Sequence, residues 1–226
     1  MQLYIGNKNY SSWSMRPWVL MKHTGIPFEE VRLRLCFDEG SEFKRRLAQV
    51  SPAGRVPALV DDGFAVWDTL AIAEYLADKF PALGLWPADV KARARARCLC
   101  AEMHSGFQAL RGRFPMNIEA SLPEVGARLL VEDAAAASDL ARIVEMWSRQ
   151  LGEHGGPFLF GAFTIADAYF APVCSRIRSY ALPVPAPVGA YVERIFGLPA
   201  VQAWVTDALA EKDFLDFDEP YRRSRG

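Results

Sequence analysis

The stretch that decides the fold reads Val-Pro-Ala-Leu-Val-Asp-Asp-Gly-Phe-Ala-Val-Trp-Asp-Thr at positions 56–69. A β-hairpin is expected here, because Asp62-Gly63 is a turn signal between two short apolar segments. Asp68-Thr69 then precedes apolar residues at helical spacing, which predicts a helix over residues 69–80. The stretch is therefore expected to form a strand-turn-strand-helix unit.

The same unit predicts a ligand pocket. A helix start carries free backbone N–H groups and a partial positive charge, so the start of the predicted helix is suited to a carboxylate. An exposed backbone amide near Val56 offers strand-like hydrogen bonds to a peptide. Together these two features predict a site for a small acidic peptide.

Working outward, the first 80 residues alternate between strand and helix patterns in the order βαβαββα. The elements expected before the hairpin are a strand at 3–5, a helix at 15–24, a strand at 30–35 and a helix at 42–49. Beyond a linker at 81–87 the chain has almost no strand signal. The helices expected there cover residues 92–111, 125–151, 165–175, 187–196 and 199–210.

Two sequences in this second part match the capping box, in which Ser or Thr precedes an acidic residue by three positions. They are Ser121 with Glu124 and Thr164 with Asp167. The basic tail at 222–226 is expected to be frayed.

This organisation resembles the glutathione S-transferase family over nearly the whole chain. The resemblance rests on the Val-Pro and Asp-Thr pairs of the opening stretch and on Phe-Leu-Phe-Gly at 158–161, which leads into Thr-Ile-Ala-Asp-Ala at 164–168. It implies an α/β plus all-α fold. A thioredoxin-like, glutathione-binding domain would cover 1–80, a linker 81–87, and a helical domain with the second-substrate site 88–226.

The resemblance also implies roles at the glutathione site. Pro57 would be cis, and the Val56 backbone would pair with the cysteinyl unit. Asp68-Thr69 would hold the γ-glutamyl end, with Asp in place of the more usual Glu. Arg55 would meet the glycine end, and Gln108 matches a glutamine that lies near glutathione in the zeta class.

The segment between the first strand and the first helix is the candidate catalytic loop. A free thiol has a pKa near 8.5, so chemistry on glutathione near neutral pH needs a group that stabilises the thiolate. A serine hydroxyl beside a helix start meets that need. In serine-type members the catalytic Ser stands four or five residues before an Arg. The position of Arg16 therefore indicates Ser12 or Ser11 as the catalytic serine. The hydroxyl of Tyr10 is an alternative.

The pattern Ser-Ser-x-Ser-x-Arg at 11–16 is similar to Ser-Ser-Cys-Ser-x-Arg of the zeta class. Here Trp13 replaces the cysteine that lines the zeta active site, which argues against the isomerase activity of that class. Trp13 is instead expected in the second-substrate pocket.

The rest of that pocket is expected on the helix over 92–111. Met103 and Phe107 would share one face of it, and His104 and Gln108 another. Arg176 and Arg178 fall near the position where zeta-type enzymes carry an arginine for substrate carboxylates.

Composition limits the classes of partner. The 226-residue chain has a net charge of −1, which gives no general attraction to nucleic acid or an anionic membrane. No apolar run is long enough to span a bilayer, and the start of the chain lacks a signal-peptide pattern. The four cysteines match no zinc or redox motif. We expect a cytoplasmic protein without metal, and the resemblance implies a homodimer.

The leading hypothesis is a glutathione transferase that adds the thiolate of glutathione, as co-substrate, to a small electrophile. A related alternative is glutathione-dependent cis–trans isomerisation of a dicarboxylic diene such as maleylacetoacetate. A third is a glutathione-binding protein without turnover, because a fold does not determine a function.

Overall fold

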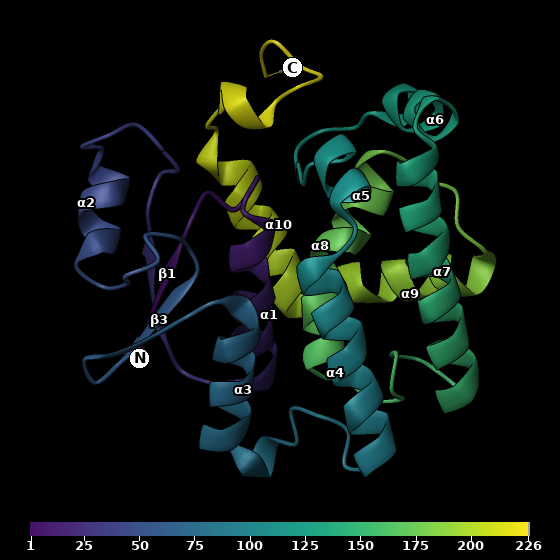
Figure 1. The fold of residues 1–226 in the computed structure, drawn as a ribbon, viewed down its shortest axis with the longest axis horizontal. Helices are drawn as coiled ribbons and strands as arrows, with labels where there is room; N and C mark the ends of the chain where they lie inside the picture. Colours follow the sequence, from purple (N-terminus) through teal and green to yellow (C-terminus); the bar gives the residue numbers. More distant parts are fainter. Residues whose placement is uncertain (226) are drawn as a thin grey trace.

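A four-stranded mixed sheet forms one side of the computed structural model, which describes residues 1–225 (Figure 1). β1 and β2 are parallel, and the other neighbouring strands are antiparallel. This arrangement confirms the predicted hairpin and the βαβαββα order. The strands, in the sheet order β2-β1-β3-β4, are Glu29–Arg32, Gln2–Ile5, Ala58–Asp61 and Phe64–Trp67.

Three helices accompany the sheet: α1 (Ser12–Thr24), α2 (Glu42–Ala48) and α3 (Thr69–Lys79). Helix α1 ends where Gly25 adopts the left-handed conformation, as its position after the helical pattern predicts. It begins three residues before the predicted Met15, because a tight turn closes the preceding loop: the N–H groups of Tyr10 and Ser11 both donate to the Asn7 carbonyl. The first turn of α1 therefore starts at the candidate catalytic serine.

The rest of the chain is helical, as predicted. Single 3₁₀ turns lie at Pro81–Leu83 (η1) and Asp216–Asp218 (η2). The helices are α4 (Val90–Ser105), α5 (Gln108–Arg113), α6 (Pro123–Glu132), α7 (Ala134–His154), α8 (Ile165–Ser179), α9 (Ala186–Phe196) and α10 (Pro199–Glu211). The capping box of Thr164 and Asp167 is present at the start of α8.

The predicted helix over 92–111 is wrong, because the chain breaks at Gly106 and Phe107. Gly106 is extended, and a Cβ there would lie only 2.8 Å from the Glu102 carbonyl oxygen. Phe107 follows in the left-handed conformation, with φ of 57°. The break buries the side chains of Phe107 and Leu110 in the core, so tertiary packing overrides the helical pattern here.

The predicted helix over 125–151 is likewise two helices, α6 and α7. Asp133 separates them and caps α7, since its side chain accepts hydrogen bonds from the N–H groups of Ala135 and Ala136. The predicted capping box at Ser121 does not form. Leu122 occupies the cap position, and Pro123 is the first helical residue.

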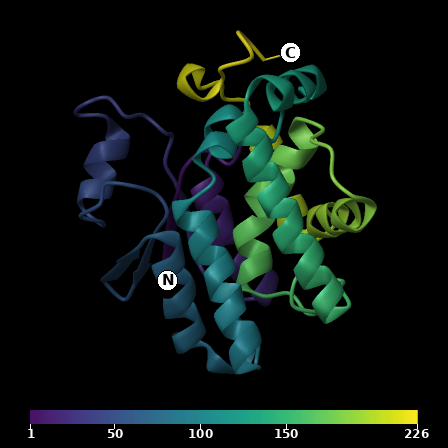
Figure 2. The same ribbon diagram turned by 45° about the vertical axis from the view of Figure 1, so that its right-hand side comes forward.

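Helix α1 lies between the two parts of the molecule, and one hydrophobic core runs through both. It packs against α8 and α10 as well as against the sheet and α3 (Figures 1 and 2). The segment at 81–87 is packed too, because Leu85 and Trp86 are buried and the Leu85 carbonyl accepts the N–H of Ile165.

The C-terminal segment after α10 folds back over the loop that follows β1, so the expected fraying is wrong for residues 222–225, and Gly226 lies outside the described residues. Glu219 is buried and accepts a hydrogen bond of 2.7 Å from the Tyr10 hydroxyl. Arg222 pairs with Glu219 and Glu119, and Arg225 also pairs with Glu119. These contacts hold the tail beside the candidate site.

Candidate functional site

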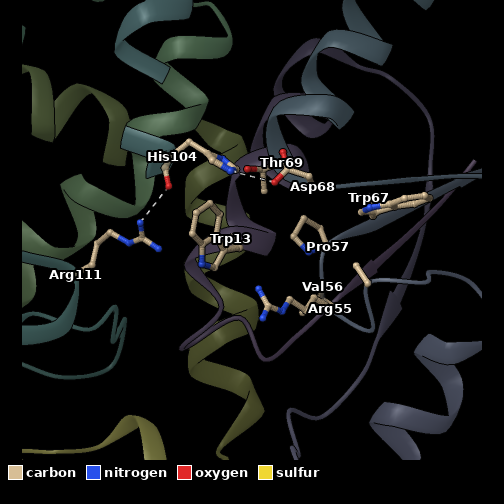
Figure 3. A pocket seen from close by; sticks show the side chains of 10 residues that line it. Trp13, Arg55, Val56, Pro57, Trp67, Asp68, Thr69, His104 and Arg111 are labelled. Carbon is tan, nitrogen blue, oxygen red and sulfur yellow. Dashed lines mark hydrogen bonds and ion pairs between the residues drawn. The ribbon is translucent and has the colours of Figure 1, made fainter. Parts of the chain in front are cut away.

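Two adjoining cavities open between the sheet and the helical part. The hairpin cavity, of about 400 Å³, is lined by Pro57, Trp67, Asp68, Thr69 and His104 (Figure 3). The serine cavity, of about 500 Å³, is lined by Ser11, Ser12, Gln108, Arg176 and Asp218 among others. Both are also lined by Trp13, Arg55, Val56 and Arg111.

The wall beside β3 presents free backbone to the hairpin cavity. The Val56–Pro57 bond is cis, which confirms the expectation from the sequence. Pro57 is buried and Val56 half-buried, directly before β3 begins at Ala58. Neither the N–H nor the C=O of Val56 pairs with another backbone group within residues 1–225. This peptide unit can therefore pair with an extended ligand.

Asp68 brings a carboxylate to the N-terminus of α3. Its backbone has φ of +76°, an uncommon conformation for a residue with a side chain. One carboxylate oxygen, Oδ1, accepts the N–H groups of Leu70 at 2.8 Å and Ala71 at 3.4 Å. The second oxygen, Oδ2, lies 3.2 Å from Nε2 of His104 (Figure 3). The side chain is 42% exposed, so the carboxylate remains open to a ligand.

Thr69 and His104 are connected through Tyr169 of α8. The Tyr169 hydroxyl lies 2.9 Å from Oγ1 of Thr69 and 2.7 Å from Nδ1 of His104. Thr69 is buried, and its hydroxyl is engaged in this contact. His104 was expected beside the second substrate, whereas the structure places its ring against Asp68 in the hairpin cavity.

The two candidate serines differ in what their hydroxyls contact. Ser11 Oγ lies 2.7 Å from Ser14 Oγ, which in turn accepts the Gly6 N–H. The Ser12 hydroxyl has no hydrogen-bond partner within residues 1–225, and its half-buried side chain lines the serine cavity in the first turn of α1. Ser12 is therefore the serine whose hydroxyl is available to a ligand.

The alternative hydroxyl of Tyr10 is already engaged. It donates to the buried Glu219 carboxylate, and burial with that bond raises the pKa of Tyr10 to about 12. Tyr4 packs with Tyr10 in a small core cluster beneath α2, in agreement with its expected place in the strand.

Arg55 and Arg111 line both cavities, Arg176 lines the serine cavity, and Arg16 lies buried behind Trp13. Arg16 and Arg176 are buried without a carboxylate partner, and burial lowers their pKa to about 10 and about 9 respectively. Arg176 donates from Nε and Nη1 to the carbonyls of Phe114 and Pro172. Its Nη2 has no partner within residues 1–225. Buried cations without a carboxylate partner favour the binding of anions.

Trp13 packs against two arginines, Arg16 and Arg111. The guanidinium carbon of Arg16 lies 4.2 Å from the Trp13 ring centroid, and that of Arg111 lies 4.6 Å from it. In the sequence, Arg16 served only to identify the candidate catalytic serine by its spacing. No sequence pattern marked Arg111 as a residue of the site. The break at Gly106 is what brings Arg111 to the site, where it donates to the His104 and Gly106 carbonyls.

Three expected pocket residues lie elsewhere, and these expectations are corrected. Met103 and Phe107 are buried in the core and line neither cavity. Met103 lies on the face of α4 that packs against α8, and Phe107 is buried by the break that follows α4. Arg178 faces the surface and pairs with Glu193 at 2.6 Å. Gln108 lines the serine cavity only, and its amide donates to the Ser105 carbonyl of the preceding turn.

Sequence reasoning also missed the contribution of the tail. Asp218 lines the serine cavity opposite α1 and α5, and burial raises the pKa of this carboxyl to about 6. No motif marks it, since its place depends on how the chain after α10 folds back.

Within residues 1–225, no three side chains of the His, Cys, Asp or Glu type converge closely enough to hold a metal ion. Over the same residues, no helix has the length and apolarity needed to cross a membrane.

Comparison with known proteins assigns both parts of the chain to domains of one family. Residues 10–79 match the family model for the glutathione S-transferase N-terminal domain, and residues 115–207 match that for its C-terminal domain. A probable maleylacetoacetate isomerase of Caenorhabditis elegans is 28% identical over 76% of each chain. The maleylacetoacetate isomerase of Rattus norvegicus is 35% identical, but the match covers only 48% of this chain and 50% of the rat protein.

Among solved structures, a glutathione transferase homolog from Burkholderia with bound glutathione superimposes with a TM-score of 0.67. It is 30% identical, and the match covers 92% of this chain and 97% of that one. The fold, the matched domains and these relatives together show that the protein belongs to the glutathione S-transferase family.

Proposed function

We propose that this protein is a glutathione transferase, in which the hairpin cavity binds glutathione and the Ser12 hydroxyl stabilises its thiolate. The observation that carries the proposal is the juxtaposition of three groups across two connected cavities. They are the unpaired Val56 backbone, the Asp68 carboxylate at the start of α3, and the free Ser12 hydroxyl at the start of α1.

Each end of the tripeptide meets a complementary group. The ammonium group of the γ-glutamyl end would pair with Asp68, and its carboxylate would lie at the N-terminus of α3. The cysteinyl unit would pair with the Val56 backbone, in the manner of an added strand. Arg55, exposed at the rim of both cavities, would meet the glycine carboxylate.

The sulfur would then enter the serine cavity beside Ser12. A hydroxyl donates a stronger hydrogen bond to a thiolate than to a thiol, so Ser12 lowers the pKa of the bound thiol. The positive end of α1 acts in the same direction. The thiolate attacks the electrophile, which is held among Trp13, Met116 and Arg176 in the same cavity.

Replacing Ser12 by alanine is expected to raise the pKa of bound glutathione by about one unit, because a lost stabilisation of about 1.4 kcal/mol falls on the charged form alone. Conjugation near pH 7 should slow by about tenfold and recover at high pH, while glutathione affinity stays nearly constant. Ultraviolet titration of the bound thiolate measures the shift.

Ser11→Ala is the matched control for this experiment. The Ser11 hydroxyl contacts Ser14, so its loss should change the thiol pKa less. A large shift in Ser11→Ala with none in Ser12→Ala would reverse the assignment. No shift in either variant would refute the hydroxyl mechanism.

A second candidate is glutathione-dependent isomerisation of a dicarboxylic diene. The observation in its favour is the buried Arg176, whose Nη2 is free to meet a substrate carboxylate in the serine cavity. The Caenorhabditis elegans and rat relatives are named as a probable maleylacetoacetate isomerase and a maleylacetoacetate isomerase, which also favours isomerisation. Thiolate addition, bond rotation and elimination would return glutathione unchanged.

A thiol count during turnover separates the two candidates. With a cis-dicarboxylic diene such as maleylacetoacetate, isomerisation leaves the amount of free thiol constant while the absorbance of the diene changes. With an aromatic halide, conjugation consumes one thiol for each product formed. Glutathione binding without either reaction would instead indicate the non-catalytic alternative.

The resemblance to the family further supports a homodimer in solution. Phe64 and Trp67 of β4 are 61% and 43% exposed in the single chain, and a subunit contact would cover such side chains. Light scattering should then give about twice the 25.2 kDa mass of one chain.

A further inference from the structure

His104 contacts the proposed amine-binding carboxylate from a distant part of the chain. Asp68 stands at the start of α3, whereas His104 lies in the last turn of α4. Their closest atoms, Oδ2 and Nε2, are 3.2 Å apart (Figure 3). Because an ionised carboxylate only accepts hydrogen bonds, a proton shared across this contact comes from Nε2.

The other side of the imidazole is held as well. Nδ1 lies 2.7 Å from the Tyr169 hydroxyl, which in turn lies 2.9 Å from Thr69 Oγ1. In the neutral ring, a proton on Nε2 leaves Nδ1 as an acceptor, so Tyr169 donates to it and accepts from Thr69. Tyr169 is itself fixed, since Arg16 packs 4.1 Å above its ring. With Nε2 facing Asp68, this chain of contacts anchors the imidazole ring through Nδ1.

Asp68 needs such support, because backbone amides hold only one of its two oxygens. Leu70 and Ala71 donate to Oδ1, and Oδ2 is left to His104. Two arginines, Arg55 and Arg111, line the same cavity, and neither pairs with Asp68. An Asp68 carboxylate that turned toward either of them would lose the orientation needed to receive an ammonium group.

We propose that His104 is a positioning residue that holds the Asp68 carboxylate in the orientation that binds the ammonium group of glutathione. This inference rests on the proposed glutathione site and adds the residue that shapes its specificity for the amine. In this proposal His104 acts through Asp68, so its effect should appear only with ligands that carry the amine.

The test compares glutathione with its analogue glutaryl-cysteinyl-glycine, in which a hydrogen replaces the α-amino group. Calorimetry on the full chain gives both dissociation constants. We expect His104→Ala to weaken glutathione binding by about five- to tenfold, less than the loss of a direct hydrogen bond to a charged group, because His104 acts through Asp68. Affinity for the amine-free analogue should change by less than about twofold.

Two further variants separate positioning from a general structural role. His104→Gln keeps an amide N–H donor near the place of Nε2 and should restore most of the preference for glutathione. Tyr169→Phe removes the hydroxyl that holds Nδ1 and should produce a smaller loss in the same direction. In His104→Ala the Tyr169 hydroxyl still has Thr69 as a partner, so the variant should fold.

The outcomes distinguish this inference from the proposed function. A wild-type protein that does not bind glutathione would overturn both. Glutathione binding with the same preference for the amine in wild type and His104→Ala would overturn the positioning role alone. An equal loss of affinity for both ligands in His104→Ala would also overturn it, because it would mean that His104 acts on another part of the tripeptide.

Discussion

Replacing Asp68 by alanine is expected to weaken glutathione binding by roughly 10- to 100-fold, because a hydrogen bond to a charged group contributes about 1.5–3 kcal/mol. The pKa of the bound thiol should change much less, since Asp68 and Ser12 line different cavities. Calorimetry gives the affinity, and thiolate absorbance gives the pKa. An unchanged dissociation constant would remove Asp68 from the proposed ammonium site.

Asp68→Asn is the matched control, because alanine removes more than the charge. Asp68 caps α3 and has a positive φ, a conformation that asparagine tolerates better than alanine. The asparagine variant should therefore keep the stability of the protein and still lose affinity. If only the alanine variant binds poorly, the cap and not the charge is what the site requires.

Replacing Asp167 by alanine is expected to lower the free energy of unfolding by about 3–5 kcal/mol, a large fraction of a typical domain's stability. Asp167 is fully buried at the start of α8. It accepts from the N–H groups of Leu159 at 3.1 Å and Thr164 at 2.8 Å, and from the Tyr191 hydroxyl at 3.1 Å. Alanine would leave these buried donors without an acceptor.

The matched control for stability is Asp89→Ala at the start of α4. Asp89 is an exposed cap that accepts the Ala92 N–H at 2.8 Å, and water can replace it, so its loss should cost only about 1 kcal/mol. Denaturant unfolding followed by circular dichroism measures both variants. Similar small losses in the two would contradict the interpretation that Asp167 organises the core around α8.

The correct predictions from sequence share a local cause. The hairpin follows from its Asp-Gly turn, α3 from the cap at Asp68, and α8 from the capping box of Thr164 and Asp167. Each signal lies within a few residues of the structure it sets, so no distant contact was needed to interpret it. The Val-Pro and Ser-Ser pairs of the candidate site are local in the same sense.

The errors arise where distant packing competes with a local pattern. Helical spacing runs through Gly106, yet the chain turns there, because burial of Phe107 and Leu110 outweighs one more helical turn. The same turn brings Arg111 to the cavity, whereas Met103 lies within α4 and packs into the core. A spacing rule along one helix cannot anticipate this change.

The sequence by itself therefore determined the order of the elements and the family, and it predicted the candidate-site residues that lie next to their own turn or cap. Only the tertiary structure decided which side chains meet across elements: His104 against Asp68, Arg111 and Arg16 against Trp13, and Asp218 of the tail in the serine cavity. The physical reason is how far apart the interacting residues lie along the chain. A turn or a cap depends on neighbouring residues, whereas these contacts depend on how α1, α4, α8 and the C-terminal tail pack together.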